Sequence, residues 1–317
     1  MMGTPNILHS SNYTLTEISN EFYSSLKRST LNSYKNDIQY FLNFISSSTH
    51  LESKLIFQES QSRLNLLALR YKNHLLEKKL APSTINRRLS AIRSLFNFAN
   101  YIGATQQSFT VKNEKVTPLK NTKGPGNRIF RLMLVESLKD QNMKSIRDHM
   151  ILRLLHDLGL RASELININI EHISMQNDDW EIKIKGKGQS EYSSIFIPES
   201  SKRVISEWLN INSNPIHGPL CISLSNSSKG RRLSRVGLYE IVKSYGKKVG
   251  IKTWPHGLRH LSITNAIIAA HEHNMPLESV LSFSRHKSIE TLMIYHDKIE
   301  NNQGKLAEII SHKFKEV

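Results

Sequence analysis

Six side chains in the second half of the chain are of the types that bind and attack a phosphate. In chain order they are Arg161, Lys187, His256, Arg259, His286 and Tyr295. Guanidinium groups hold the non-bridging oxygens of a phosphate in a fork, while imidazole and ammonium groups transfer protons. A phenol is an adequate nucleophile once it is oriented. Together these residue types predict a phosphate site with its own nucleophile.

Local sequence already places three of the six. The run Gly159-Leu-Arg-Ala-Ser-Glu-Leu165 puts Arg161 between the glycine that ends one helix and the start of the next, so local backbone holds its side chain. His256 and Arg259 are three residues apart and therefore neighbours on one helical face. Taken singly, each residue has an ordinary explanation as a surface arginine, a hairpin lysine or a core tyrosine. The joint order of the six carries the prediction.

One pair of histidines resembles a metal site, but the spacing of the two residues does not favour metal binding. In His271-Glu272-His273 the histidines are two residues apart, which puts them on different helix faces. A zinc helix places its histidines four residues apart. We therefore expect a solvated loop or helix end there, and no metal site in the chain.

The first third of the chain has the periodicity of a helical domain. Apolar residues at steps of three and four predict helices over 30–45, 64–76 and 83–103, with Ser83 or Thr84 as N-cap of the last. Opposite its apolar stripe, that helix carries a basic and small-polar face that includes Arg87, Ser90, Arg93 and Ser94. Such a face suits DNA phosphates, and a merely solvated face is the alternative.

A basic segment with Pro and Gly but no periodicity, residues 112–128, is predicted to be a linker whose Lys115, Lys120 and Lys123 follow DNA. It joins a helical DNA-binding domain over 1–111 to a larger domain over 129–317. In the larger domain we expect a hairpin from 180–185 and 194–198, and helices over 132–138, 146–158, 201–209, 235–249 and 257–270. The fold class is therefore mainly α with a small β-sheet.

Composition indicates the kind of partner. The chain has 317 residues with 43 Lys and Arg against 27 Asp and Glu, a net charge of +16, and the excess is present in both domains. Charge spread over folded sequence favours a polyanion held along an extended surface, most commonly nucleic acid, although a surplus serving only solubility is the alternative.

The single cysteine, Cys221, excludes a disulfide framework. Without a signal peptide or a membrane-length apolar run, we expect a cytoplasmic, nucleoid-associated protein.

In the order and spacing of the six residues, the chain resembles the tyrosine recombinases, the family of phage integrases and Xer-type recombinases. Its matching motifs are Gly-Leu-Arg-x-Ser-Glu-Leu around Arg161, Gly-Lys-Gly around Lys187, His-x-Leu-Arg-His from His256, and Tyr295 nine residues after His286. The helices over 30–45 and 83–103 are similar to the family's core-binding helices. The resemblance therefore covers nearly the whole chain.

Three positions depart from the family pattern. Ser284-Arg285 stands before His286 where the family usually has glycine at the second place, and the basic side chain is expected either to add a phosphate contact or to disturb the turn. Gln189-Ser190-Glu191-Tyr192 follows Lys187 in place of further basic residues, and Leu261 replaces a common threonine. None of these departures removes one of the six groups.

The resemblance implies a SAM-like helical core-binding domain and an α+β catalytic domain that form a C-shaped clamp on duplex DNA. Tyr295 would attack the scissile phosphate to give a 3′-phosphotyrosyl bond and a free 5′-hydroxyl. Arg161, Arg259 and His286 would stabilise the transition state, Lys187 would protonate the leaving oxygen, and His256 would assist proton transfer. Because the covalent link conserves bond energy, neither ATP nor a metal cofactor is expected.

The resemblance also implies assembly. A protein that is a monomer in solution would form a homotetramer on paired recombination sites. The apolar face formed by Leu306, Ile309, Ile310 and Phe314 would dock on a neighbouring catalytic domain. The alternative is that this C-terminal helix folds back on its own domain.

Three other functions remain as alternatives. A type IB topoisomerase uses a similar residue set on one duplex as a monomer. A DNA-binding repressor with the same fold would have no need for the phenol. A metal-dependent transposase needs clustered acidic ligands, and the only similar pair, Asp178-Asp179, precedes a strand.

The positive charge predicts a steep salt dependence of DNA binding. Phosphate contacts from both domains release many counterions, so affinity should fall by roughly 10³ or more between about 50 and 200 mM salt. Fluorescence anisotropy with a labelled duplex measures this. A flat response would contradict the polyanion interpretation.

Overall fold

The computed structural model describes residues 14–48, 53–116, 124–176, 179–186, 191–286, 288–290, 292–293, 307–308 and 310–311. The chain divides into two compact units, Met1–Leu119 and Lys120–Val317. Each unit contains its own hydrophobic core. The division falls inside the segment 112–128, for which the sequence predicts a linker.

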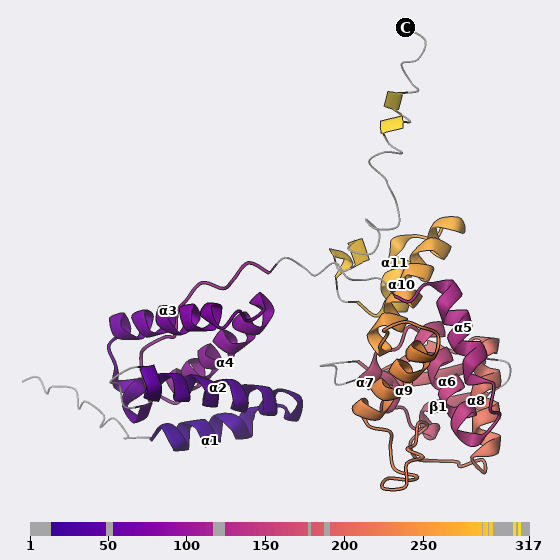
Figure 1. Ribbon diagram of the computed structural model, residues 1–317, viewed down its shortest axis with the longest axis horizontal. Helices are drawn as coiled ribbons and strands as arrows, with labels where there is room; N and C mark the ends of the chain where they lie inside the picture. Colours follow the sequence, from indigo (N-terminus) through magenta and orange to yellow (C-terminus); the bar gives the residue numbers. More distant parts are fainter. Residues whose placement is uncertain are drawn as a thin grey trace, which may run out of the picture. The chain divides into compact units, whose positions relative to one another are not determined.

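The first unit is a helical bundle (Figure 1). Its helices are α1 (Leu15–Ser25), α2 (Arg28–Ser48), the 3-10 helix η1 (Ser53–Gln58), α3 (Gln61–Glu77) and α4 (Pro82–Tyr101). Helix α4 contacts α1, α2 and α3, and the ring of Phe41 meets those of Tyr71 and Phe109 edge to face in the core. The three helices predicted here are confirmed, whereas α1 and η1 are additional to the prediction.

The start of α4 differs from the sequence prediction. The helix begins at Pro82 with Ala81 as its N-cap, and no side chain caps it. Proline is favoured at the first helical position because its fixed φ suits the helix and it has no N–H to satisfy. The prediction of Ser83 or Thr84 as N-cap is therefore wrong.

The chain after α4 returns along the bundle. Phe109 is buried in the core, and Arg93 Nη2 donates to the carbonyl of Val111 at 2.5 Å and to Asn113 Oδ1 at 2.8 Å. The side chain of Asn86 exchanges two hydrogen bonds with the backbone of Glu114, at 2.9 and 2.8 Å. Residues 112–114, expected to open the linker, are thus bound to the first unit.

The second unit is built around one central helix. Its helices are α5 (Asn127–Ser137), α6 (Met143–Asp157), α7 (Ala162–Ile166), the 3-10 helix η2 (Ile170–His172), α8 (Glu199–Ile211), α9 (Arg235–Lys248), α10 (Pro255–Glu272) and α11 (Leu277–Ser284). Helix α6 contacts α5, α7, α8 and α10, and α11 lies beside α10 (Figure 1). The buried residues of α6 do not form a single stripe, as expected of a helix covered on several sides.

A small antiparallel sheet completes this unit, in the order β1 (Ile173–Gln176), β2 (Asp179–Lys185), β3 (Tyr192–Phe196). Ile182 and Ile184 are buried, whereas Lys183 and Lys185 alternate with them on the exposed face. The predicted hairpin is confirmed, and β1 is an additional strand. The mainly α fold class with a small sheet is therefore correct.

The chain enters the second unit closely packed against α10. A Cβ atom on Gly124 would lie 2.6 Å from Leu261 Cβ and 2.7 Å from the carbonyl oxygen of Gly257. Only glycine fits so close an approach. None of the helices in the described part of the chain has the length and apolar character needed to cross a membrane.

The contacts of Arg93 generate a test that separates a structural role from a DNA contact. Arg93→Ala should release residues 111–113 and lower the stability of the first unit by about 1–3 kcal/mol, the usual cost of losing hydrogen bonds made by a charged group. Lys115→Ala, at an exposed residue, should instead weaken DNA binding with little change in stability. Chemical denaturation and anisotropy measure the two effects, and an unchanged stability of Arg93→Ala would refute the structural role.

Candidate active site

The turn between α6 and α7 positions Arg161. Helix α6 ends at Asp157, and Gly159 has a left-handed φ of +53°, which glycine adopts without strain. Arg161 is the N-cap residue of α7, and its backbone N–H donates to Glu164 Oε2 at 2.8 Å. Its Nη1 donates to Glu164 Oε1 at 2.7 Å. The predicted placement of Arg161 at a helix junction is confirmed.

Helix α10 positions His256 and Arg259. It begins at Pro255, so both residues lie in its first turns and on one face. Arg259 is fully buried, and its two Nη groups donate to the carbonyls of Gly159 and Ser284. The ring of His256 meets that of His260 edge to face, with centroids 4.2 Å apart. Arg259 is therefore fixed between the end of α6 and the end of α11.

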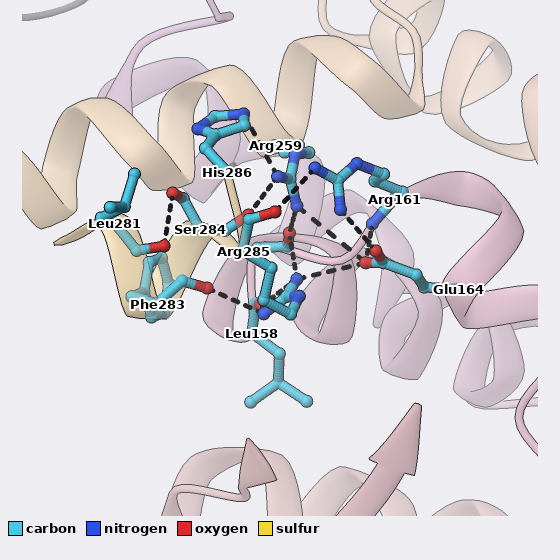
Figure 2. A network of polar contacts seen from close by, with 10 residues as sticks. Leu158, Arg161, Glu164, Arg259, Leu281, Phe283, Ser284, Arg285 and His286 are labelled. Atoms are coloured by element: carbon cyan, nitrogen blue, oxygen red, sulfur yellow. Dashed lines mark hydrogen bonds and ion pairs between the residues drawn. The ribbon is translucent and has the colours of Figure 1, made fainter. Parts of the chain in front are cut away.

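The end of α11 brings in His286. Arg259 Nη2 lies 3.4 Å from His286 Nε2, and Arg161 Nη2 donates to the carbonyl of Arg285 at 3.1 Å. Figure 2 shows His286 on one side of Arg259 and Glu164 on the other. The backbone carbonyls of Ser284 and Arg285 thus each hold one of the two predicted catalytic arginines.

The carboxylate of Glu164 is the centre of this network. It is fully buried, accepts the two hydrogen bonds from Arg161, and lies 3.2 Å from Arg285 Nη2 and 4.0 Å from Arg259 Nη1. Burial alone would raise the pKa of Glu164, but the charge of Arg285 and the hydrogen bonds from Arg161 outweigh burial and hold the pKa below its usual value. Glu164 is therefore ionised at neutral pH.

Both histidines of the site are neutral at neutral pH. Burial, with the charges of Arg259 and Arg161, lowers the pKa of His286 to about 4. Burial and the same two arginines lower the pKa of His256. A neutral imidazole has one nitrogen that donates and one that accepts a hydrogen bond. Each can therefore take part in proton transfer without adding charge.

Four of the six predicted catalytic residues come together here, namely Arg161, His256, Arg259 and His286. Lys187 and Tyr295 lie outside the described residues, as do Lys120 and Lys123 of the expected DNA-binding set. His271 and Glu272 form the last turn of α10. Among the described residues, no three side chains of metal-binding type gather into a site.

The remaining DNA-binding candidates are in the first unit. Arg87 is exposed on α4 and forms an ion pair with the buried Asp37. Ser90 is 3.5 Å from the Tyr34 hydroxyl, Ser94 is half-buried, and Lys115 is exposed. Their contact with DNA stays a prediction.

The sequence patterns do not predict the positions of two side chains in this network, those of Glu164 and Arg285. The spacing of Glu164 could have predicted its position, because it lies three residues after the N-cap Arg161. A carboxylate at that place in a helix reaches back to the N-cap backbone. Arg285 takes a left-handed conformation with φ of +53° at the C-cap of α11. The turn is kept although the residue is not glycine.

Comparison with known proteins identifies the family of the chain. The model of the phage integrase family matches residues 131–302, and that of the phage integrase N-terminal SAM-like domain matches residues 21–101. The first match alone spans more than half of the chain. The chain belongs to the phage integrase family.

Curated relatives of this recombinase include two further tyrosine recombinases. Tyrosine recombinase slr0733 of Synechocystis sp. is 33% identical over 249 residues, which cover 77% of this chain and 78% of the relative. Tyrosine recombinase Synpcc7942_B2651 of Synechococcus elongatus is 30% identical and covers 88% of both chains. The recombinase is thus a tyrosine-type enzyme, as its six residues predict.

Solved structures share its fold. A XerH recombinase in a post-cleavage complex with a palindromic difH substrate matches with a TM-score of 0.68 at 17% identity, covering 93% of this chain and 84% of that one. A lambda integrase dimer bound to a core site matches with a TM-score of 0.62 at 13% identity, covering 89% and 95%. At these identities the likeness shows the fold.

The lowered pKa of His286 predicts acid sensitivity of the second unit. An unfolded histidine takes up a proton near pH 6.5, whereas His286 in the folded unit resists protonation until about pH 4. Unfolding between these values therefore takes up protons, and stability falls as the pH falls through this window. Urea denaturation from pH 7 to 4 should show a flatter dependence for His286→Gln than for the wild type. The exposed His217→Gln serves as control, and equal slopes in all three proteins would contradict the shift.

Proposed function

We propose that this recombinase cleaves and rejoins DNA strands at specific sites, using Tyr295 as nucleophile, for integration, excision or resolution of DNA. The observation that carries the proposal is the cluster that Arg161, His286 and His256 form around the fully buried Arg259. Two guanidinium groups and two neutral imidazoles converge there, and Tyr295 follows all four of these residues in the sequence. A DNA-binding repressor would have no need to hold Arg259 fully buried among backbone carbonyls.

The chemistry is an exchange of one phosphodiester for another. The Tyr295 hydroxyl oxygen attacks the scissile phosphorus and forms a P–O bond, while the bond from phosphorus to the 5′-oxygen breaks. The tyrosine proton leaves toward a neutral histidine or water, and Lys187 supplies a proton to the departing 5′-oxygen. Attack by the 5′-hydroxyl of a partner strand reverses these steps and releases Tyr295. The bond count is unchanged, so no ATP is consumed.

Arg161 and Arg259 stabilise the charge that develops on the non-bridging oxygens. Their guanidinium groups are held in place before DNA arrives by Glu164 and by the carbonyls at residues 159, 284 and 285. Donors that are already oriented need no reorganisation during the reaction, which makes them effective in a water-poor site. His286, beside Arg259, adds a neutral hydrogen-bonding group.

The wider function is proposed on the same basis. The domain over 1–111 and the basic linker bind duplex DNA, and together with the catalytic domain they clamp it. Four copies assemble on paired sites, with the C-terminal helix of each docking on a neighbour. The lambda integrase of one matching structure is a tetramer bound to a Holliday junction, which supports this proposal. A DNA substrate also agrees with a cytoplasmic, nucleoid-associated location.

Covalent capture tests the proposed function and identifies the target sequence at the same time. The wild type is incubated in EDTA with a library of nicked duplexes of randomised sequence, in which the cleaved end diffuses away and traps the intermediate. A denaturing gel should show a protein–DNA adduct, and sequencing the captured DNA defines the site. Tyr295→Phe should bind the captured duplex with unchanged affinity and form no adduct, because it loses only the hydroxyl. An adduct formed by Tyr295→Phe would assign the nucleophile elsewhere, and an adduct that requires added Mg²⁺ would refute metal-free cleavage.

The proposed acid role of Lys187 has its own test. Lys187→Ala should slow cleavage of the captured duplex by a factor on the order of 10²–10⁴, the usual contribution of a general acid. A substrate with a 5′-bridging phosphorothioate should restore the rate, because sulfur leaves without protonation. Equal losses of cleavage rate on both substrates would show that Lys187 acts in DNA binding and does not transfer the proton.

A further inference from the structure

Arg285 stands at the position where the family usually has glycine, and its side chain turns inward. Its Nη1 donates to the carbonyls of Phe283 at 2.8 Å and Leu158 at 3.2 Å. Its Nη2 donates to the carbonyl of Gly159 at 2.8 Å and to Glu164 Oε2 at 3.2 Å, and it lies 3.2 Å from the carbonyl of Leu158. Figure 2 shows this guanidinium on the side of Arg259 away from His286. Both of its Nη groups are thus occupied by protein acceptors.

These contacts join two segments that are far apart in the sequence. Leu158 and Gly159 directly follow the last residue of α6, whereas Phe283 lies in the last turn of α11. A cation is favoured at the carbonyl end of a helix, and here one guanidinium serves the ends of both helices. The side chain is 15% exposed. The Arg285 side chain is therefore a largely buried link between the α6 end and the turn that carries His286.

The link bears directly on both predicted catalytic arginines. The backbone carbonyls of Ser284 and Arg285 accept from Arg259 and Arg161, so a shift of this turn moves both guanidinium groups. The Glu164 carboxylate is shared as well, since Arg259 Nη1 is 4.0 Å from the oxygen that Arg285 contacts at 3.2 Å. Without Arg285, that oxygen becomes available to draw Arg259 toward it and away from the phosphate.

We propose that Arg285 is a positioning residue of the strand-cleavage reaction, which sets the places of Arg259, Arg161 and His286 through its link to α6 and its share of Glu164. Where the family's glycine adopts the left-handed turn freely, the side-chain hydrogen bonds of Arg285 hold this turn against the end of α6. We place Arg285 behind the phosphate-binding groups, because its guanidinium contacts the ends of α6 and α11 and lies on the side of Arg259 away from His286. This inference rests on the proposed function and adds a residue to its machinery.

The central experiment compares Arg285→Gly with the wild type on the duplex captured by the wild-type protein. Glycine accepts the left-handed backbone, so this variant removes the anchor and keeps the turn. At saturating DNA, cleavage should be roughly 10- to 100-fold slower, since misplacing a positioning group by about 1 Å costs up to about 10²-fold. The Kd for the same duplex should be unchanged. A wild-type cleavage rate, or a loss confined to Kd, would overturn the proposal, the second by making Arg285 a DNA contact.

Chemical rescue separates the guanidinium from the backbone. Millimolar guanidinium chloride should restore part of the cleavage rate of Arg285→Gly, whereas the same concentration of sodium chloride should not. Arg285→Lys, which keeps the charge and a single donor group, should retain an intermediate rate. Slow cleavage without guanidinium rescue would assign the defect to the turn itself and would overturn the proposal.

A matched variant at another buried arginine guards against a merely structural effect. Arg147 is a buried arginine on α6 bound to Asp148 and to the carbonyl of Ile222, about 16 Å along the helix from Leu158 at 1.5 Å per residue. Arg147→Ala, or Arg147→Lys if the alanine variant does not fold, should lower Tm and leave the cleavage rate at saturating DNA unchanged. A loss equal to that of Arg285→Gly would reduce the role of Arg285 to stability.

The shared carboxylate predicts a non-additive pair. Glu164→Gln removes the charge that competes for Arg259, so it should slow cleavage less in the Arg285→Gly background than in the wild type. Additive losses would contradict the sharing of Glu164. A wild-type protein that forms no adduct at all would instead refute the proposed function, so the two failures are distinguishable.

Discussion

The arrangement of the catalytic unit depends on one buried carboxylate surrounded by three arginines. Burying an ionised carboxylate is costly unless it is paired and hydrogen-bonded. Glu164 meets this condition by accepting two hydrogen bonds from Arg161 and one from Arg285, with Arg259 at 4.0 Å. Since these arginines come from the start of α7, the end of α11 and α10, the requirements of one carboxylate bring three segments of the chain to one point.

Those segments converge because α6 provides a common base. The carbonyls at the C-terminal end of α6 accept from Arg259 and Arg285, and its buried residues pack against α5, α8 and α10. The site is thus built on a helix that cannot move without disturbing the core. Placing catalytic groups on such a base limits their motion before substrate binds, which is what preorganised electrostatic stabilisation requires.

Local sequence is sufficient for the parts of this structure that depend on spacing. The pair His256 and Arg259, the helix break at Gly159 and the hairpin of β2 and β3 all follow from periods and turn residues within a few positions. Helix α11 escapes prediction because it has only eight residues and depends on packing against α10. Helix α1 is missed although the capping box of Thr14 and Glu17 marks its start in the sequence. The inward course of Arg285 is equally unpredictable, because its acceptors at Leu158 and Gly159 lie more than a hundred residues away. For a similar reason the pattern assigns Arg93 to a DNA-facing surface, although its carbonyl and amide acceptors come from the segment after α4.

The net charge of the site favours the transition state over the bound substrate. Among the described side chains, three arginine cations and one carboxylate, with His256 and His286 neutral, leave two positive charges around the proposed phosphate position, to which Lys187 as the proposed general acid adds a third. A bound phosphodiester carries one negative charge, and attack by a deprotonating phenol adds a second in the transition state. The cluster is thus better matched to the transition state than to the ground state, which is the condition for an interaction to accelerate the reaction. Removing Glu164 alone would leave an excess of positive charge that favours the bound DNA as well, so the carboxylate also contributes to this difference.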